Sequence, residues 1–320
     1  MITTALTRLF GIRHPLVLGP MGGVSGGALA AAVSNAGGLG LVGGGYGDAQ
    51  WVQREIALAK AGTDQPWGVG FITWAASREV IELALAQKPV AVMLSFGDPG
   101  PFARLIRAAG CKLICQVQGH DETRQAVAAG ADLIVAQGTE AGGHGGTRAT
   151  FPLVPVIADA VAPIPVIAAG GIADGRGLAA ALMLGAEGAL LGTRFYATPE
   201  ALGHDNVKGR IVQASGGDTV RTSVFDTVRG FDWADRYTGR AVRNAFTERW
   251  HGQPDQTPLG EPAAQQAYRQ AARQGDVDTA VVWAGENVDL IARIEPAGDI
   301  VQRIAREAET LLASAASRLS

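Results

Sequence analysis

A glycine-rich segment from Gln137 to Gly146 carries the residues whose types are best suited to chemistry. Five of its ten residues are glycine, and its titratable groups are Glu140 and His144. A backbone with few side chains can approach a large flat ligand closely. An imidazole, whose pKa lies near neutrality, can take a proton from an acidic carbon or give one to it. We therefore interpret His144 as a catalytic acid–base group, against the alternative of a structural histidine.

Three other residues of this segment are placed to bind a ligand. Gln137 follows an apolar run from Asp132 to Ala136, which predicts a buried strand. At the end of that strand, the Gln137 amide could hydrogen-bond a polar ring edge or a sugar hydroxyl. Gly142 and Gly143 would let the backbone lie beside the same ligand.

Two glycine turns later in the chain predict a phosphate site. They are Ala169-Gly170-Gly171 and Leu191-Gly192-Thr193, and each follows an apolar run. In barrels of alternating strands and helices, the last two such loops often bind phosphate through backbone N–H groups and a helix N-terminus. The alternative is a pair of tight turns that only close a barrel.

A fourth motif, Pro20-Met21-Gly22-Gly23, follows the first apolar run. The polarizable sulfur of Met21 packs well against an aromatic ring, although a core methionine is an equal alternative. The glycines would expose N–H groups to ring heteroatoms. Together with the glycine–histidine segment and the paired turns, this motif predicts a flat phosphorylated cofactor such as FMN.

The elements that must position these motifs are eight apolar runs, each followed by a helical pattern at a repeat of roughly 25 residues. The expected strands cover residues 15–21, 39–42, 67–73, 90–95, 112–117, 132–136, 165–168 and 188–191. Continuous apolar strands fit a sheet that is covered on both faces, and eight of them predict an α/β fold of the (β/α)8 TIM-barrel type. A doubly wound sheet would have its glycine-rich turn after the first strand, whereas here glycines follow five strands.

The sequence changes character after the eighth run. We assign residues 1–200 to the barrel and expect residues 201–320 to form a mostly helical region that covers the barrel mouth and packs on the barrel. Helices are expected at 206–214, 240–249, 262–274 and 300–315. Arginines and aromatic residues are frequent here, but interleaved acids favour a solvated or ion-paired face over a nucleic-acid surface. These acids are Asp218, Asp226, Asp232 and Asp235.

The composition excludes several classes of partner. With 27 basic and 30 acidic residues, the 320-residue chain has a net charge of −3, which attracts neither nucleic acid nor an anionic membrane. No apolar run reaches ~18 residues, and the first ten residues lack a secretion signal, so we expect a cytoplasmic protein with a small-molecule substrate. Cys111 and Cys115 lie too far apart on one expected strand to form a disulfide, and no metal site is predicted. A homodimer is left open.

The sequence also resembles the nitronate monooxygenase family, once called 2-nitropropane dioxygenases. The resemblance is carried by Pro20 to Gly23, Gln137 to His144, Ala168 to Ile172 and Leu191 to Phe195. It covers residues 14 to about 250 and extends more loosely to residues 283–291. The glycine–histidine motif is its specific part, because many FMN barrels share the paired turns.

This resemblance implies that Gln137, Gly142, Gly171 and the turn from Leu190 to Thr193 bind FMN, and that His144 is the catalytic base. The implied reaction is oxidation of an alkyl nitronate, or of a nitroalkane that His144 has deprotonated. One electron passes to the flavin, and O₂ reacts to leave a carbonyl compound and nitrite. No nicotinamide is required.

Two residues depart from the family pattern. Ile72 stands where many members carry an asparagine, which puts the substrate in question more than the cofactor, and Asp289 replaces a common glycine.

Two other functions stay open. The first alternative is an FMN-dependent NAD(P)H reductase, similar to enoyl-acyl carrier protein reductases or NADH:quinone reductases. The second is a barrel that binds a phosphorylated metabolite without flavin.

Overall fold

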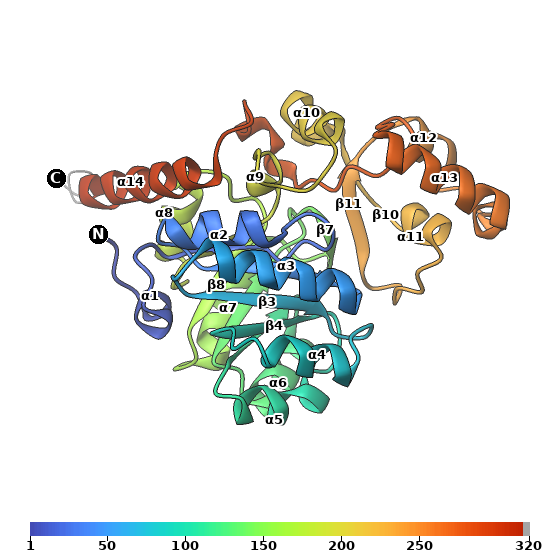
Figure 1. Ribbon diagram of the computed structural model, residues 1–320. Helices are drawn as coiled ribbons and strands as arrows, with labels where there is room; N and C mark the ends of the chain where they lie inside the picture. Colours follow the sequence, from blue (N-terminus) through green and yellow to red (C-terminus); the bar gives the residue numbers. More distant parts are fainter. Residues whose placement is uncertain (316–320) are drawn as a thin grey trace.

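A parallel barrel of eight strands dominates the computed structural model, which describes residues 1–315 (Figure 1). The strands follow the order β1-β9-β8-β6-β5-β4-β3-β2, and a bridge between Val17 and Leu39 joins the two outer strands of this order. The bounds are β1 Leu16–Leu18, β2 Gly40–Gly45, β3 Trp67–Ile72, β4 Ala91–Ser95, β5 Lys112–Val117, β6 Leu133–Gln137, β8 Val166–Ala169 and β9 Ala189–Leu191. The predicted TIM barrel is confirmed.

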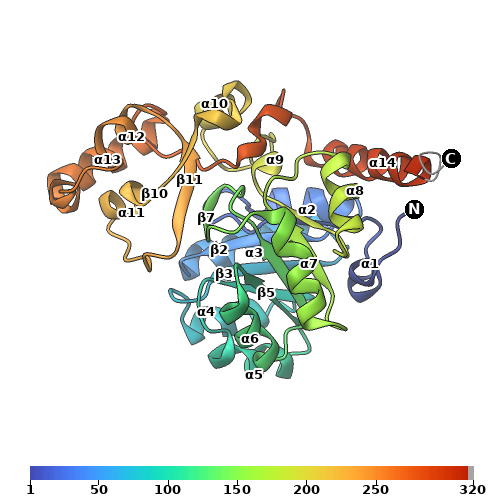
Figure 2. The ribbon, with the colours of Figure 1, turned by 180° about the vertical axis from the view of Figure 1, so that it is seen from behind.

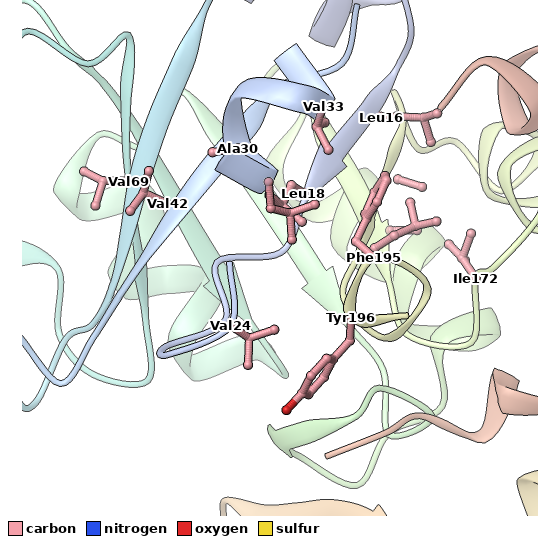
Figure 3. Packing of buried hydrophobic residues seen from close by; sticks show 14 of the residues in the cluster. Leu16, Leu18, Val24, Ala30, Val33, Val42, Val69, Ile172, Phe195 and Tyr196 are labelled. Carbon is pink, nitrogen blue, oxygen red and sulfur yellow. The ribbon is translucent and has the colours of Figure 1, made fainter. Parts of the chain in front are cut away.

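Helices follow the strands and surround the sheet (Figures 1 and 2). They are α2 Gly27–Asn35, α3 Ala49–Gly62, α4 Arg78–Leu85, α5 Gly100–Ala108, α6 His120–Ala129, α7 Thr150–Val161 and α8 Gly175–Met183. Alternate strand residues such as Leu41, Met93 and Val135 fill the barrel interior, which Leu6 of α1 (Ala5–Phe10) also enters. The opposite strand faces pack against the helices, where Leu18, Val33 and Phe195 belong to one buried cluster (Figure 3).

The sequence also predicts that Ser25 and Asp174 cap helices, and that Pro152 and Pro155 confine the regular helix of residues 151–161 to its later part. Asp174 caps α8, as expected, since its side chain accepts hydrogen bonds from the N–H groups of Arg176 and Gly177. Proline was expected to shorten the helix at 151–161, but α7 runs from Thr150 to Val161 with Pro155 inside it. Ser25 does not cap α2, because its hydroxyl instead bonds the backbone N–H and C=O of Met21. This bond fixes the first glycine loop.

The region after β9 contains two short strands besides its helices. Its bounds are α9 Thr193–Tyr196, α10 Asp205–Gln213, η1 Gly216–Asp218, β10 Thr219–Thr222, α11 Val224–Arg229, β11 Thr238–Val242, α12 Ala245–Trp250, η2 Thr257–Gly260, α13 Pro262–Gln274, η3 Glu286–Leu290 and α14 Ala297–Ala315. The helix expected at 240–249 is therefore a strand end and a short helix. The helix at 262–274 has the expected bounds.

A second sheet joins this region to the barrel. β11 lies between β10 and β7 (Gly143–Gly145), and all pairs are antiparallel. β7 belongs to the glycine-rich segment after β6, so the later chain pairs directly with that segment. α14 returns to the outside of the barrel, where it packs on α8 and α2 (Figure 2). The boundary that we place near residue 200 stays a prediction.

Across residues 1–315, no helix combines the length and the apolar character that crossing a membrane would demand.

Candidate active site

A cavity lies at the carboxyl ends of the barrel strands, under the second sheet. Its lining includes the last residues of four strands: Gly45 of β2, Ile72 of β3, Ala169 of β8 and Leu191 of β9. Its empty space, open solvent included, is about 1230 Å³. A cavity at this end of a barrel is the candidate ligand site.

The cavity brings together the predicted site residues with one exception. Those that line it are Pro20, Met21, Gly22, Gln137, Gly142, Gly143, His144, Ala169, Gly170, Gly171, Leu191, Gly192 and Thr193. Gly23 is the exception, since it is not among the lining residues and its φ of +74° serves the turn before α2. Segments far apart in the sequence thus meet at one place, as the barrel topology requires.

Three loops, Pro20–Gly22, Ala169–Gly171 and Leu191–Thr193, form what we call the backbone wall of the cavity. Gly170 and Gly171 have φ values of +102° and +75°, which favour glycine. A Cβ on Gly192 would meet only Met21 Sδ, at 3.6 Å, so the space beside this backbone is open. A surface of peptide groups without intruding side chains fits the flat ring and the phosphate of FMN.

Gly142, which lines the cavity, and Glu140, which does not, each have a structural partner. A Cβ on Gly142 would stand 2.6 Å from the carbonyl carbon of Ala284, so the close approach of this later segment requires glycine there. The Glu140 carboxylate accepts hydrogen bonds from the backbone N–H and the hydroxyl of Thr150, at 2.9 and 2.8 Å. Glu140 therefore holds the start of α7 and is engaged away from proton transfer.

Gln137 lines the cavity, but its amide is largely occupied by protein groups. Its Oε1 accepts hydrogen bonds from Gln116 Nε2 and Gln118 Nε2, at 3.1 and 2.8 Å. Its Nε2 donates to the carbonyl oxygen of His144 at 3.0 Å. Gln137 thus fixes the backbone that carries the imidazole.

Two arginines, the half-buried Arg221 and the buried Arg240, tie the glycine-rich segment to the second sheet. Arg221 donates to the carbonyl oxygens of Thr139 and Gly145, at 3.1 and 2.6 Å, and also to that of Thr238. Arg240 donates to the same Thr139 oxygen at 2.9 Å. Burial lowers the pKa of Arg221 to about 10, yet the guanidinium stays charged at neutral pH. These contacts hold β7 in place.

His144 sits in β7 opposite Gly239 of β11, with 9% of its side chain exposed. Its Nε2 lies 2.9 Å from Oδ2 of Asp226, which belongs to α11. Burial lowers the pKa of His144, and the Asp226 carboxylate partly opposes that shift. Within residues 1–315, Nδ1 has no hydrogen-bond partner, and it is not fully buried. A neutral imidazole that lines the cavity and has one nitrogen free is suited to accept a proton.

Aromatic rings surround the imidazole. The indole of Trp233 stacks on it, with ring centroids 3.6 Å apart and planes 4° apart. Trp283 and Phe96 lie beside it, at centroid distances of 5.2 and 6.3 Å. We call the cavity-lining residues His144, Trp233, Trp283, Phe96 and Arg229 the side-chain wall. This wall is apolar apart from the imidazole and one guanidinium.

Sequence reasoning missed most of the side-chain wall. Asp226 was assigned to a solvated or ion-paired face, but only 4% of its side chain is exposed and it contacts His144. Trp233 was noted only as one of many late aromatic residues, although its Nε1 donates to the Tyr46 hydroxyl at 3.0 Å. The density of aromatic residues after residue 195 was a usable signal. Nothing in the sequence indicated which of them meet His144.

The two departures from the family pattern have separate consequences. Ile72 lines the cavity, so this part of the wall is apolar where an asparagine was expected from the resemblance. Asp289 does not line the cavity, and its Oδ2 accepts a hydrogen bond from the Gly216 N–H at 2.8 Å. Asp289 thus joins η3 to η1, whereas Ile72 changes the space available to a substrate.

Comparison with protein families gives one assignment for almost the whole chain. The family model described as nitronate monooxygenase matches residues 3–79 and 72–307. The nitronate monooxygenase of Neurospora crassa is 34% identical, over 93% of this chain and 90% of that protein. A (3aS,4S,5R,7aS)-5-hydroxy-7a-methyl-1-oxo-octahydro-1H-indene-4-carboxyl-CoA dehydrogenase of Mycobacterium tuberculosis is 40% identical over 70% of this chain. That match spans 64% of the dehydrogenase, which is less than two thirds of its length.

Two solved structures are similar over almost the whole chain. FabK from Thermotoga maritima superimposes with a TM-score of 0.88 at 34% identity, covering 99% of this chain and 100% of that one. The nitroalkane oxidase of Streptomyces ansochromogenes superimposes with a TM-score of 0.80 at 33% identity, with the same coverage. Both likenesses include the barrel and the region that follows it.

Proposed function

The chain belongs to the nitronate monooxygenase family and is an oxidoreductase, and from this premise we propose that it oxidises nitroalkanes and alkyl nitronates with O₂, using FMN, to carbonyl compounds and nitrite. The observation that carries this proposal is the position of His144. Its imidazole lines a cavity that three loops of largely bare backbone also line. The resemblance to a nitroalkane oxidase at 33% identity supports the same substrate class.

The backbone wall would hold the cofactor. The turns at Gly170-Gly171 and Gly192-Thr193 would bind the phosphate through peptide N–H groups, and Met21 would lie against the ring. When bound, FMN would supply an acceptor for one or two electrons and a site for reaction with O₂. The remaining chemistry falls to the side chains of this chain.

His144 would act on the substrate carbon. A nitroalkane carries an acidic C–H next to the nitro group, and His144 Nδ1 would take that proton to leave the nitronate. Since burial lowers the pKa of His144, the imidazole is neutral at neutral pH and ready to accept a proton. Phe96, Trp233 and Trp283 would exclude water and enclose the alkyl group.

A second candidate is an FMN-dependent NAD(P)H reductase on the same barrel. Two findings support keeping it: the match to a relative named a dehydrogenase, and the TM-score of 0.88 to FabK. In that case His144 would give a proton to the substrate instead of taking one. The cavity fits both chemistries, so the two candidates differ in the source of electrons.

Anaerobic mixing of the FMN-loaded protein with each reductant separates them. We expect a nitroalkane or its nitronate to bleach the visible flavin absorbance, and admission of O₂ to release nitrite. NAD(P)H should reduce the flavin far more slowly than turnover. Rapid bleaching by NAD(P)H, with no nitrite from nitroalkanes, would establish the reductase instead.

A further inference from the structure

Asp226 is a buried carboxylate whose hydrogen bonding is incomplete. Its Oδ2 meets His144 Nε2 at 2.9 Å, while its Oδ1 has no hydrogen-bond partner within residues 1–315. The nearest cation is Arg229, whose Nη1 lies 3.9 Å from Oδ1. A buried charge with so little compensation costs folding free energy. Asp226 is therefore poorly explained as a stabilising residue.

Asp226 also stands behind the imidazole and away from the substrate. His144 and Arg229 line the cavity, whereas Asp226 does not. The side chain is brought there by α11, where Val224, Phe225 and Val228 anchor the helix in the small core of the second sheet region. The carboxylate is thus fixed to a packed element, and it reaches the substrate only through His144.

The bond to Asp226 selects one edge of the imidazole. Stacking on Trp233 fixes the plane of the imidazole ring. A half-turn about the Cβ–Cγ bond of His144 would keep that plane and exchange the positions of the two ring edges. A carboxylate can only accept, so the nitrogen that faces Asp226 must carry the hydrogen. In a neutral imidazole the other nitrogen, Nδ1, then has the free lone pair.

We propose that Asp226 is a positioning residue, which accepts the His144 Nε2–H bond and thereby keeps Nδ1 unprotonated and directed to the substrate carbon. This inference rests on the proposed function in so far as His144 is the base. During reaction the proton moves from the substrate carbon to Nδ1, and the C–H electron pair stays on the substrate as the nitronate. The Nε2 proton stays with His144, and the side chain of Asp226 stabilises the imidazolium that forms.

The charges that face His144 give this role a pH signature. Asp226 raises the pKa of His144, whereas burial, Arg229 of α11 and Arg221 of β10 lower it. Removing the carboxylate leaves only the lowering influences among these groups. In an Asp226→Asn variant, the rate of nitroalkane oxidation should therefore begin its fall on the acid side, the acid limb of the pH profile, at a lower pH than in wild type. The maximal rate of the profile should also be lower.

The test compares Asp226→Asn and Asp226→Glu with Asp232→Asn, which removes an exposed carboxylate from the neighbouring loop. Each FMN-loaded protein is assayed on a neutral nitroalkane and on its preformed nitronate across pH. We expect Asp226→Asn to lose on the order of 10- to 100-fold in kcat on the nitroalkane, the loss typical when the partner of a functional histidine is removed. The nitronate rate should change less than about threefold, because no proton abstraction is needed. Asp226→Glu should recover part of the loss, and Asp232→Asn should match wild type.

Ring-¹⁵N NMR of histidine-labelled protein gives a readout that does not depend on turnover. His144, assigned by its absence in His144→Asn, should show a protonated Nε2 and an unprotonated Nδ1 in wild type, and a mixture of both forms in Asp226→Asn. A protonated Nδ1 in wild type would overturn the proposal, even if Asp226→Asn fails to fold. Equal losses on nitroalkane and nitronate, with an unmoved acid limb, would overturn it as well. If wild type oxidises neither substrate, the proposed function fails, but the tautomer still decides the role of Asp226.

Discussion

The two walls of the cavity are built in different ways. The backbone wall consists of loops at strand ends, where glycines expose peptide groups and carry no charge. The side-chain wall consists of an imidazole, a guanidinium and large aromatic rings, most of them supplied by the region after residue 200. Barrel closure alone places the first wall, whereas the second requires β7 to pair with β11. Cofactor binding and proton transfer should therefore respond to different mutations.

The largest effect is expected for Arg221, which ties the glycine-rich segment after β6 to the second sheet. Arg221→Met would leave the carbonyl oxygens of Thr139, Gly145 and Thr238 without this donor. The Thr139 oxygen still accepts from Arg240, so two acceptors lose this donor. At about 1–3 kcal/mol each, we expect the free energy of unfolding to fall by roughly 2 kcal/mol or more. Urea denaturation measures this change. Arg269→Met, on the exposed face of α13, should stay within about 0.5 kcal/mol of wild type, and equal losses in both variants would disprove the link.

A smaller effect is expected on the backbone wall. Gly192→Val places a side chain in open space beside Met21 without requiring a left-handed backbone. We expect the dissociation constant of FMN to rise roughly 10- to 100-fold, as overpacking of a close contact typically costs about 1–3 kcal/mol. Flavin titration measures it, and the Tm of the flavin-free protein should be unchanged. A Cβ added at Gly260 meets no atom within 4 Å, so Gly260→Val is the control. Unchanged flavin affinity in Gly192→Val would move the cofactor away from this wall.

The smallest effect is expected in the pH dependence of folding stability, through His144 of the side-chain wall. In the unfolded chain the pKa of His144 has its ordinary value of 6.5, whereas burial lowers that pKa in the folded state. Below 6.5 the unfolded chain therefore holds more protons, and the folded state loses stability as the pH falls. Urea unfolding between about pH 7 and about pH 5 should show a larger loss for wild type than for His144→Asn. Parallel pH curves would contradict the lowered pKa.

The sequence predicted the first wall far better than the second, for a physical reason. Glycines at the ends of apolar strands mark places where backbone approaches a ligand, and the barrel count alone brings Met21, Gly171 and Gly192 to one end. The strand Thr219–Thr222 is largely buried but carries no apolar run, because Thr219 and Arg221 make side-chain hydrogen bonds there. Asp226 lies 82 residues from His144, so neither spacing nor periodicity relates them. The wrong helix at 240–249 has the same cause, since residues 240–242 pair with β10 and this long-range pairing overrides the local pattern.

The most direct test of the account is His144→Asn assayed on a neutral nitroalkane and on its preformed nitronate. A general base typically contributes about 10²- to 10⁴-fold, so we predict a loss of that order in kcat/KM on the nitroalkane. The nitronate, which has already lost its proton, should be oxidised within about threefold of the wild-type rate. The same modest loss on both substrates would contradict the assignment of His144 as the base.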